Sequence, residues 1–311
     1  MDLGFFNDKI LINATYVHNR SSNQLLSYSL PMITGFESII GNFPATVQNA
    51  SWEFSLNTEN FHRKNFSWTS SFNITFPKNK LVSFPNLSTS SYASSLVIGQ
   101  PVNIIKVWRF KGVDTQTGIY QFADSAGNIT SSPTQKDRTI LINTLPTYYG
   151  GLQNNIHYGQ FELDFLIQFV KQIGVQTFYS SGAGIAPGVG YAGFSNQPTS
   201  VLENVWKKTG DNPAIQKYSA NYFSSYAKVS QILGSDAGYS DASYIRLKSV
   251  SISWQVPNQW QKKLGVQNCT ISVEGQNLFT VSKYKGIDPE TQNINSLPPL
   301  RVIVIGLQIG L

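Results

Sequence analysis

Apolar and polar residues alternate along many stretches of this chain, and a period of two is the signature of β-strands with two different faces. In the segment 65–77 one face is apolar except for Ser70, and the opposite face contains only polar residues. Residues 160–169 of the segment 160–172 repeat the pattern, with Leu166 as an exception. The apolar rows are Phe66, Trp68, Phe72, Ile74 and Phe76 in the first segment, and Phe161, Leu163, Phe165, Ile167 and Phe169 in the second.

The same alternation predicts eight long antiparallel strands. They run over 9–18, 45–58, 65–77, 148–158, 160–172, 243–256, 268–277 and 301–311. Strands of globular proteins usually have about 5 to 6 residues, whereas a tilted strand that crosses a bilayer needs about 9 to 11. Their length therefore favours strands that span a membrane.

The connections between these strands alternate in length. Short links at 59–64, at 158–160 and at 258–268 are expected on one side of the sheet, and the segments 19–44, 78–147, 174–242 and 278–300 are expected as long loops on the other. Transmembrane β-barrels have this asymmetry, with short periplasmic turns and long extracellular loops. Within the long loops, 101–112 is predicted to be extended, and Thr199 or Ser200 is predicted to cap a short helix that Gly210 terminates.

The segment Ser243–Pro257 predicts a strand whose two faces lie in different environments. Val250, Ile252, Trp254 and Val256 form one row, and serines form the other. We expect the apolar row to face lipid and the serines to line a wet lumen. Arg246 and Lys248 belong to the same row as Trp254 but lie at the end of the strand next to the long loop. There they are predicted to reach water and lipid phosphate. A soluble antiparallel sandwich or barrel is the alternative.

Composition narrows the class further. Only 13% of the 311 residues are charged, the single cysteine Cys269 excludes an internal disulfide, and no apolar run is long enough for a spanning helix. The opening MDLGFFNDKI has no features of a signal peptide. The net charge of +6 is dispersed, which disfavours nucleic acid and fits anionic lipid or lipopolysaccharide near the protein.

The candidate chemistry is that of binding. Four carboxylates fall on predicted lumenal positions, and aromatic residues in the long loops could stack on sugars or peptides. The carboxylates are Glu53, Glu162, Asp164 and Glu274, and the aromatic candidates are Tyr191, Phe194, Trp206, Tyr222, Tyr226 and Tyr239. No catalytic motif, cofactor or metal site is predicted, and the oxygen-bearing residues Asp124, Asn128 and Asp137 are too sparse to form a calcium loop. A hydrolase and a soluble or surface glycan-binding module are the competing interpretations.

Several segments resemble one family. SYIRLKSVSISWQVP, then VEGQNLFTVSKYKGIDPE and the final LPPLRVIVIGLQIGL resemble the end of SusC/RagA-type TonB-dependent outer-membrane transporters. Further similarity runs through DLGFFNDKILINATY, LPMITGFESI and PTYYGGLQNNIHYGQFELDF. The resemblance covers nearly the whole chain, which corresponds to about the last third of a family member.

The resemblance implies a fold, a location and partners. Residues 1–311 would be the C-terminal part of the barrel in the outer membrane, without the plug domain, and about eight strands would form an open, curved sheet. It also implies import of an oligosaccharide or peptide, a SusD-like lipoprotein over the external loops, and energy from TonB through the plug.

Overall fold

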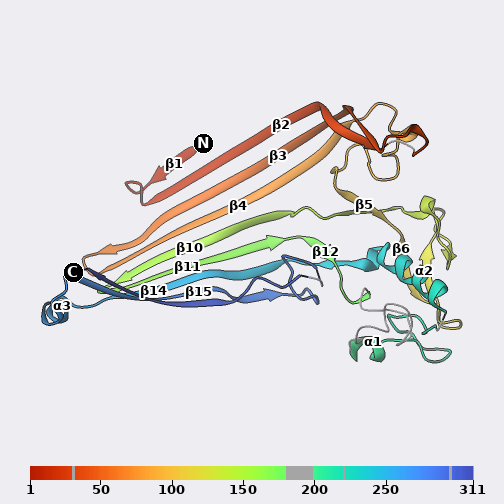
Figure 1. The fold of residues 1–311 in the computed structure, drawn as a ribbon. Helices are drawn as coiled ribbons and strands as arrows, with labels where there is room; N and C mark the ends of the chain where they lie inside the picture. Colours follow the sequence, from red (N-terminus) through yellow and green to blue (C-terminus); the bar gives the residue numbers. More distant parts are fainter. Residues whose placement is uncertain (30–31, 180–198, 220, 294–295, 311) are drawn as a thin grey trace.

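The structure is a computed structural model that describes residues 1–29, 32–179, 199–219, 221–293 and 296–310. Figure 1 shows one long curving sheet, with most of the irregular segments gathered at the end that carries α1 and α2. The sheet has nine strands, and every pair of neighbours is antiparallel. In spatial order they are β1 (Asp2–Phe5), β2 (Ile10–Ser29), β3 (Ser38–Arg63), β4 (Phe66–Ser83), β10 (Tyr148–Tyr158), β11 (Phe161–Lys171), β14 (Tyr244–Gln255), β15 (Asn268–Ser282) and β16 (Val302–Gly310).

The prediction of an open antiparallel sheet is confirmed. β1 and β16 stand at opposite edges and do not pair with each other. All eight predicted strands are present, and the short β1 is an addition that the sequence pattern did not indicate. The backbone of each edge strand therefore has one side without a strand partner within the part of the chain that the structure describes.

Several expected connections are wrong in detail. The predicted link 59–64 lies largely within β3, and β4 and β15 continue to Ser83 and Ser282, into the predicted loops. Residues 19–29 and 38–44 do not form a loop, because β2 and β3 stay paired from Ile10↔Thr58 as far as Ser29↔Ser38. A hairpin that projects into water pairs its backbone without needing an apolar row, so alternation could not reveal this extension. The link 258–268 contains a helix, α3 (Asn258–Leu264), which ends where Gly265 adopts a left-handed conformation with φ of 70°.

The sheet has two chemically different faces, which we call the apolar face and the polar face. One row of the apolar face crosses β3, β4, β10 and β11 at Leu56, Phe72, Leu152 and Ile167. One row of the polar face crosses β10, β11, β14 and β15 through carboxylate, amide and hydroxyl side chains, and its members are Asn155, Asp164, Ser251 and Glu274. The alternation predicted from the sequence is therefore maintained across the strands.

Aromatic residues form two belts on the apolar face. The belt nearer the long loops contains Tyr16, Trp52, Phe54, Phe76, Tyr148 and Phe169, with neighbouring ring centroids as close as 4.8 Å. The belt nearer the short turns contains Phe61, Phe66, Trp68, Tyr158, Phe161, Trp254 and Trp260. Nine residues separate Trp52 from Phe61, which is about 30 Å along the strand and about 23 Å along the normal at a tilt of ~40°. This spacing matches the apolar band of about 25 Å in transmembrane barrels.

A small polar cluster interrupts the apolar face between the belts. The side-chain oxygen of Asn154 accepts hydrogen bonds from Trp68 Nε1 at 2.9 Å and from Ser70 Oγ at 2.7 Å, and Asn60 Nδ2 donates to Ser70 Oγ at 2.7 Å. Asn154 is only 5% exposed. Ser70, the exception in the sequence pattern, is therefore satisfied by its neighbours, as a polar group in hydrocarbon must be.

Gly150 illustrates how closely the sheet is packed. A Cβ at this position would lie 2.1 Å from the carbonyl oxygen of Asn73 and 2.6 Å from the ring of Phe169. The Phe169 ring stacks on Phe72 with centroids 5.7 Å apart and covers the space that a side chain would occupy. Glycine is therefore required here by close approach.

A bulge corrects the predicted orientation of Arg246 and Lys248. The register between β14 and β15 shifts between Leu247 and Ser249. Lys248 is also skipped in the pairing of β14 with β11, where Leu166 pairs with Ser249 and Ile167 pairs with Leu247. One extra residue reverses the facing of everything beyond it, so Ile245 and Leu247 continue the apolar face and Arg246 turns to the polar face. Arg246 is 1% exposed instead of reaching lipid phosphate, and Lys248 lies with Glu290 on the same side, 3.6 Å away.

The loops fold together into a compact unit, which we call the external module. It comprises 104–143, 199–219 and 221–241, from two separate loops, with Tyr179. Its elements include β5 (Ile104–Val107), β6 (Arg109–Val113), β7 (Tyr120–Ala123), β8 (Ile129–Thr130), β9 (Ile140–Asn143), α1 (Thr199–Glu203), α2 (Tyr222–Leu233) and β13 (Tyr239–Asp241), which pairs with β12 (Ile173–Val175). The prediction that 101–112 is extended is confirmed by β5 and β6, whereas α1 ends at Glu203 and not at Gly210.

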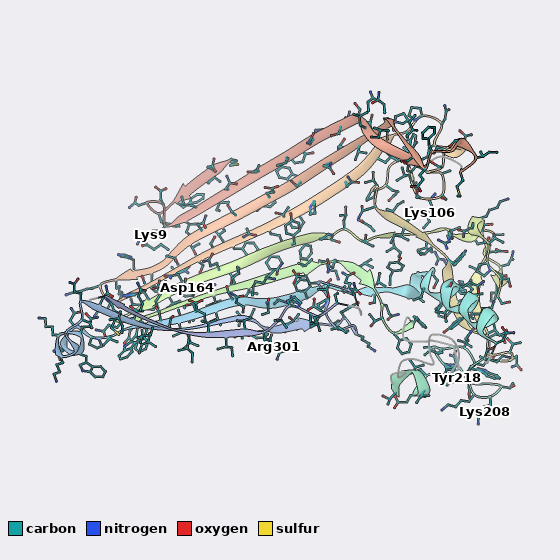
Figure 2. The ribbon with its side chains drawn as sticks, in the orientation of Figure 1. Lys9, Lys106, Asp164, Lys208, Tyr218 and Arg301 are labelled. Carbon is teal, nitrogen blue, oxygen red and sulfur yellow. The ribbon has the colours of Figure 1, made fainter. Side chains whose placement is uncertain are left out.

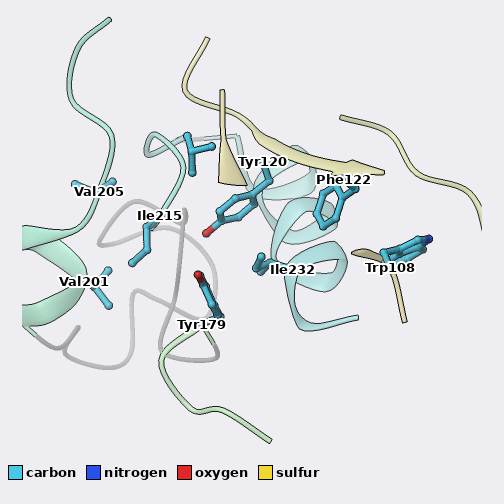
Figure 3. Close-up of a cluster of buried hydrophobic side chains, with 9 residues drawn as sticks. Trp108, Tyr120, Phe122, Tyr179, Val201, Val205, Ile215 and Ile232 are labelled. Atoms are coloured by element: carbon cyan, nitrogen blue, oxygen red, sulfur yellow. The ribbon is translucent and has the colours of Figure 1, made fainter. Parts of the chain in front are cut away.

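The external module has its own hydrophobic core. Figure 3 shows Tyr120, Phe122, Ile232, Ile215 and Tyr179 converging from different segments, and the first four are fully buried. The two loops are also joined through backbone hydrogen bonds, from Lys217 N to Gly118 O at 2.8 Å and from Asp236 N to Trp108 O at 2.9 Å. The loops therefore support each other's conformation.

Among the helices of the described residues, none has the length and apolar character required to cross a bilayer.

We predict that Phe122→Ala loosens the external module by about 3–5 kcal/mol, because a large, fully buried ring is removed from its core. Limited proteolysis should then cleave the segment 108–123 faster than in the unchanged protein. Tyr120→Phe is the matched control. It removes a buried hydroxyl that has no hydrogen-bond partner among the described residues, so equal or greater protease resistance is expected. Unchanged cleavage of the alanine variant would contradict the assigned core.

Candidate functional site

Two predicted lumenal carboxylates meet on the polar face. Asn155 Nδ2 on β10 donates hydrogen bonds to Glu162 Oε1 and to Asp164 Oδ1 on β11, each at 2.9 Å. The amide holds the two acidic side chains side by side. Because β10 and β11 are joined by the tight turn at Gly159, with φ of 62°, this arrangement is built from one short hairpin.

A third predicted carboxylate continues the same surface. Asp164 pairs with Ser251 on β14, and Ser251 pairs with Glu274 on β15. Two strand spacings therefore separate the Asp164 and Glu274 backbones, or about 10 Å. We call the surface formed by Asn155, Glu162, Asp164, Ser251 and Glu274 the acidic patch. It presents hydrogen-bond acceptors and negative charge to whatever passes along the polar face.

Glu53 lies apart from the acidic patch. It pairs with Thr75 and accepts a hydrogen bond from Ser51 Oγ at 2.9 Å. The β3 residue in the same row as Asp164 is Glu59, because Glu59 pairs with Thr69, Thr69 with Asn155, and Asn155 with Asp164. Glu59 lies six residues further along β3 than Glu53. Six residues of strand correspond to about 20 Å. Glu53 is therefore a separate acidic group nearer the long loops.

The loop aromatic candidates divide into three groups. Trp206 packs against the core of the external module, donates from Nε1 to Thr115 O at 3.3 Å and lies beneath the Lys217 ammonium. Tyr239 is half-buried on β13, and burial raises the pKa of its hydroxyl. Tyr222 and Tyr226 belong to α2, and their side chains, like all of Tyr191 and Phe194, lie outside the described residues. Trp206 therefore has an evident packing role.

The sparse acidic loop is stabilised by its own backbone. The side chain and backbone N–H of Asn128 hold the pKa of Asp124 below its ordinary value. The backbone N–H of Thr134, at 2.7 Å, does the same for the pKa of Asp137. Among the residues that the structure describes, no group of three or more His, Cys, Asp or Glu side chains could hold a metal ion.

An ion cluster that sequence reasoning missed lies above the acidic patch. Arg246 forms ion pairs with Asp288 and Glu290, and its Nε donates to Thr280 Oγ1 at 2.9 Å. The Arg246 guanidinium also lies 5.2 Å from the ring centre of Tyr244. Asp288 and Glu290 belong to the segment KGIDPE, which carried the family resemblance but had no assigned role. The cluster fixes this segment against the polar face.

Figure 2 shows that the acidic patch and the external module lie at different levels of the protein. Asp164 lies in the sheet toward the end with the short turns, whereas Tyr218 and Lys208 lie in the external module at the other end. The arrangement therefore offers an acidic wall below and a folded loop unit above. It contains no grouping that resembles a catalytic centre within the described ranges.

We predict that Arg246→Gln destabilises the segment 283–293 by about 3–5 kcal/mol, because it leaves the buried carboxylate of Asp288 without its partner. Amide hydrogen exchange of this segment should accelerate accordingly. Adding Asp288→Asn to that variant should recover part of the protection. As the control, Lys171→Gln breaks the exposed pair with Asp241 and should cost less than about 1 kcal/mol. Equal losses of stability in Arg246→Gln and Lys171→Gln would refute the structural role of the cluster.

Comparison with known proteins gives consistent results. No family model matches the chain. TonB-dependent receptor P3 of Formosa agariphila is 26% identical over 340 residues, covering 100% of this chain and 32% of that protein. TonB-dependent receptor SusC of Bacteroides thetaiotaomicron is 22% identical, covering 99% of this chain and 31% of that protein. The chain therefore spans about a third of the length of these curated relatives.

Solved structures show the same fold. The RagAB peptide transporter superposes with a TM-score of 0.80 at 20% sequence identity, covering 99% of this chain and 34% of that chain. The RagAB peptide importer in its open-open state gives a TM-score of 0.79 at 18% identity. The resemblance to a C-terminal SusC/RagA-like segment is thus confirmed, and the antiparallel sheet has the fold of the matching part of the RagAB transporter. The relatives are transporters and not enzymes, which agrees with the prediction of a non-enzymatic protein.

Proposed function

We propose that this chain, homologous over its whole length to TonB-dependent receptors of the SusC/RagA type, forms barrel wall and external loops of an outer-membrane importer. The observation that carries the proposal is the two-faced sheet. Its apolar face has two aromatic belts at the spacing of a bilayer, and its polar face has the acidic patch. The rest of the barrel and the plug would come from sequence outside these 311 residues.

The substrate class that we propose is an oligosaccharide or a peptide. Glu162, Asp164 and Glu274 offer acceptors for sugar hydroxyls, peptide N–H groups or cationic side chains. Of the two, peptides have support from the fold shared with the RagAB peptide transporter. The external module would contact the substrate and a SusD-like lipoprotein from outside, and TonB would act through the plug.

Adjacent residues on β14 provide a sharp test of the two faces. In a Cys269→Ala background, Ser251→Cys should react with a water-soluble maleimide in intact outer membranes. Ile252→Cys, the next residue on the apolar face, should remain unlabelled until the membrane is dissolved. Ile252 is 50% exposed in the chain, so only lipid would protect it. Equal labelling of both positions would instead support the soluble or surface-attached binding module.

The acidic patch predicts a charge-dependent uptake phenotype. In the complete transporter, Glu162→Gln combined with Asp164→Asn should lower the uptake of cationic peptides by about thirtyfold, because two charge-assisted contacts of about 1 kcal/mol each are lost. Uptake of neutral peptides should change little. Glu53→Gln is the matched control, since it removes a carboxylate from the same face but from outside the patch. A uniform loss for all substrates would indicate a barrel defect and not recognition.

A further inference from the structure

We propose that the apolar face carries a specific site for a phosphate-bearing lipid of the outer leaflet, formed by Arg20, Lys78 and Lys80 above the aromatic belt nearer the long loops. The proposal rests on the proposed function, in which the apolar face meets the outer membrane and the long loops lie on its outer side. It adds a ligand, its chemistry and its position on the wall.

The strand register brings the basic residues together. Arg20 on β2 pairs with Gln48 on β3, which pairs with Lys80 on β4. One row closer to the belt, His18 pairs with Ala50, which pairs with Lys78. The next row contains the belt residues Tyr16, Trp52 and Phe76. Two rows of basic and polar side chains therefore follow directly on the aromatic row, across the same three strands.

These cations lack carboxylate partners. Arg20 Nη2 donates to the Gln48 side-chain oxygen at 2.9 Å, and none of the ion pairs in the described part of the chain involves Arg20, Lys78 or Lys80. Lys171 offers a contrast at a similar level of the sheet, because its ammonium is held 2.8 Å from Asp241. The positive charge over β2, β3 and β4 is thus available to an external anion.

A hollow lies at the same place. A cavity of about 380 Å³ is lined in part by the belt residues Tyr16, Trp52 and Phe76 together with Ala50, Lys78 and Lys80. Loop residues that include Gly99, Pro101, Asn143 and Leu145 complete the lining, and Arg20 lies outside it. Ala50 has a single side-chain carbon, while the next positions on its face are Gln48 and Trp52, so the surface recedes at this point. Lys78 and Lys80 are both exposed beside the hollow.

The combined chemistry selects an amphiphile with an anionic headgroup. Aromatic rings at the edge of the apolar band pack against acyl chains near the headgroup level of the membrane. Lysine and arginine directly above them bind phosphate. Each basic residue near an anionic lipid surface contributes about 1 kcal/mol. The site lies on the side of the long loops, which corresponds to the outer leaflet, where a phosphorylated glycolipid of the lipid A type meets these requirements.

Binding to defined lipids tests the proposal. The full chain, purified in detergent, is titrated with bisphosphorylated lipid A, with its dephosphorylated form and with phosphatidylethanolamine, and bound lipid is counted by native mass spectrometry. Lys78→Gln combined with Lys80→Gln should weaken the binding of bisphosphorylated lipid A by about tenfold or more. Lys207→Gln combined with Lys208→Gln removes the same charge from the external module and should change the affinity less than about twofold.

The alternative outcomes separate the possible errors. Equal affinity for phosphorylated and dephosphorylated lipid, or equal effects of the two double variants, would overturn the site. Competition by inorganic phosphate at the concentration of the lipid would identify a phosphate site without a lipid component, which also overturns the proposal. Failure of the proposed function would appear separately, as loss of the labelling difference between Ser251→Cys and Ile252→Cys.

Discussion

Hydrocarbon offers no hydrogen bonds, and this constraint determines how the sheet is built. Inside a bilayer each backbone N–H and C=O must find a partner on a neighbouring strand, so the strands must be long, antiparallel and continuously paired. Side chains at successive residues then point to opposite faces, which forces one face toward lipid and the other toward water. The polar cluster between the two belts obeys the same constraint, since Ser70 donates to Asn154 and Asn60 donates to Ser70.

The sequence predicted the parts of the fold that follow from this constraint. Phe72, Phe165 and Ile252 lie on the apolar face, and Asp164 and Ser251 lie on the polar face, because each sits in an uninterrupted alternating segment. Glu162 and Asp164 were correctly placed together with Glu274 on one surface. Their mutual hydrogen bonds to Asn155 could not be anticipated, because they depend on the register between two strands.

Errors arose where a single residue breaks the pattern or where tertiary packing decides. The apolar positions change phase at Lys248, from Ile245 and Leu247 to Val250 and Ile252. Extending the Trp254 row through this bulge predicted that Arg246 faces lipid, whereas Arg246 is buried against Asp288. The extension of β2 and β3 was missed because their outer ends lack a continuous apolar row. The core of the external module was invisible for another reason: Phe122 and Ile232 belong to different loops, and only the fold brings them together.

The shared core of the external module has a consequence for how such a surface can diversify. Trp108, Phe122, Ile215 and Ile232 come from two loops that are far apart in the chain, yet each loop completes the other's interior. If recombination between related genes exchanged only one of the two loops, side chains of the new loop would pack against those of the original loop. The shared core would then be poorly packed. Inherited variation in the two loops should therefore be correlated, and new specificities should arise when both change as a unit.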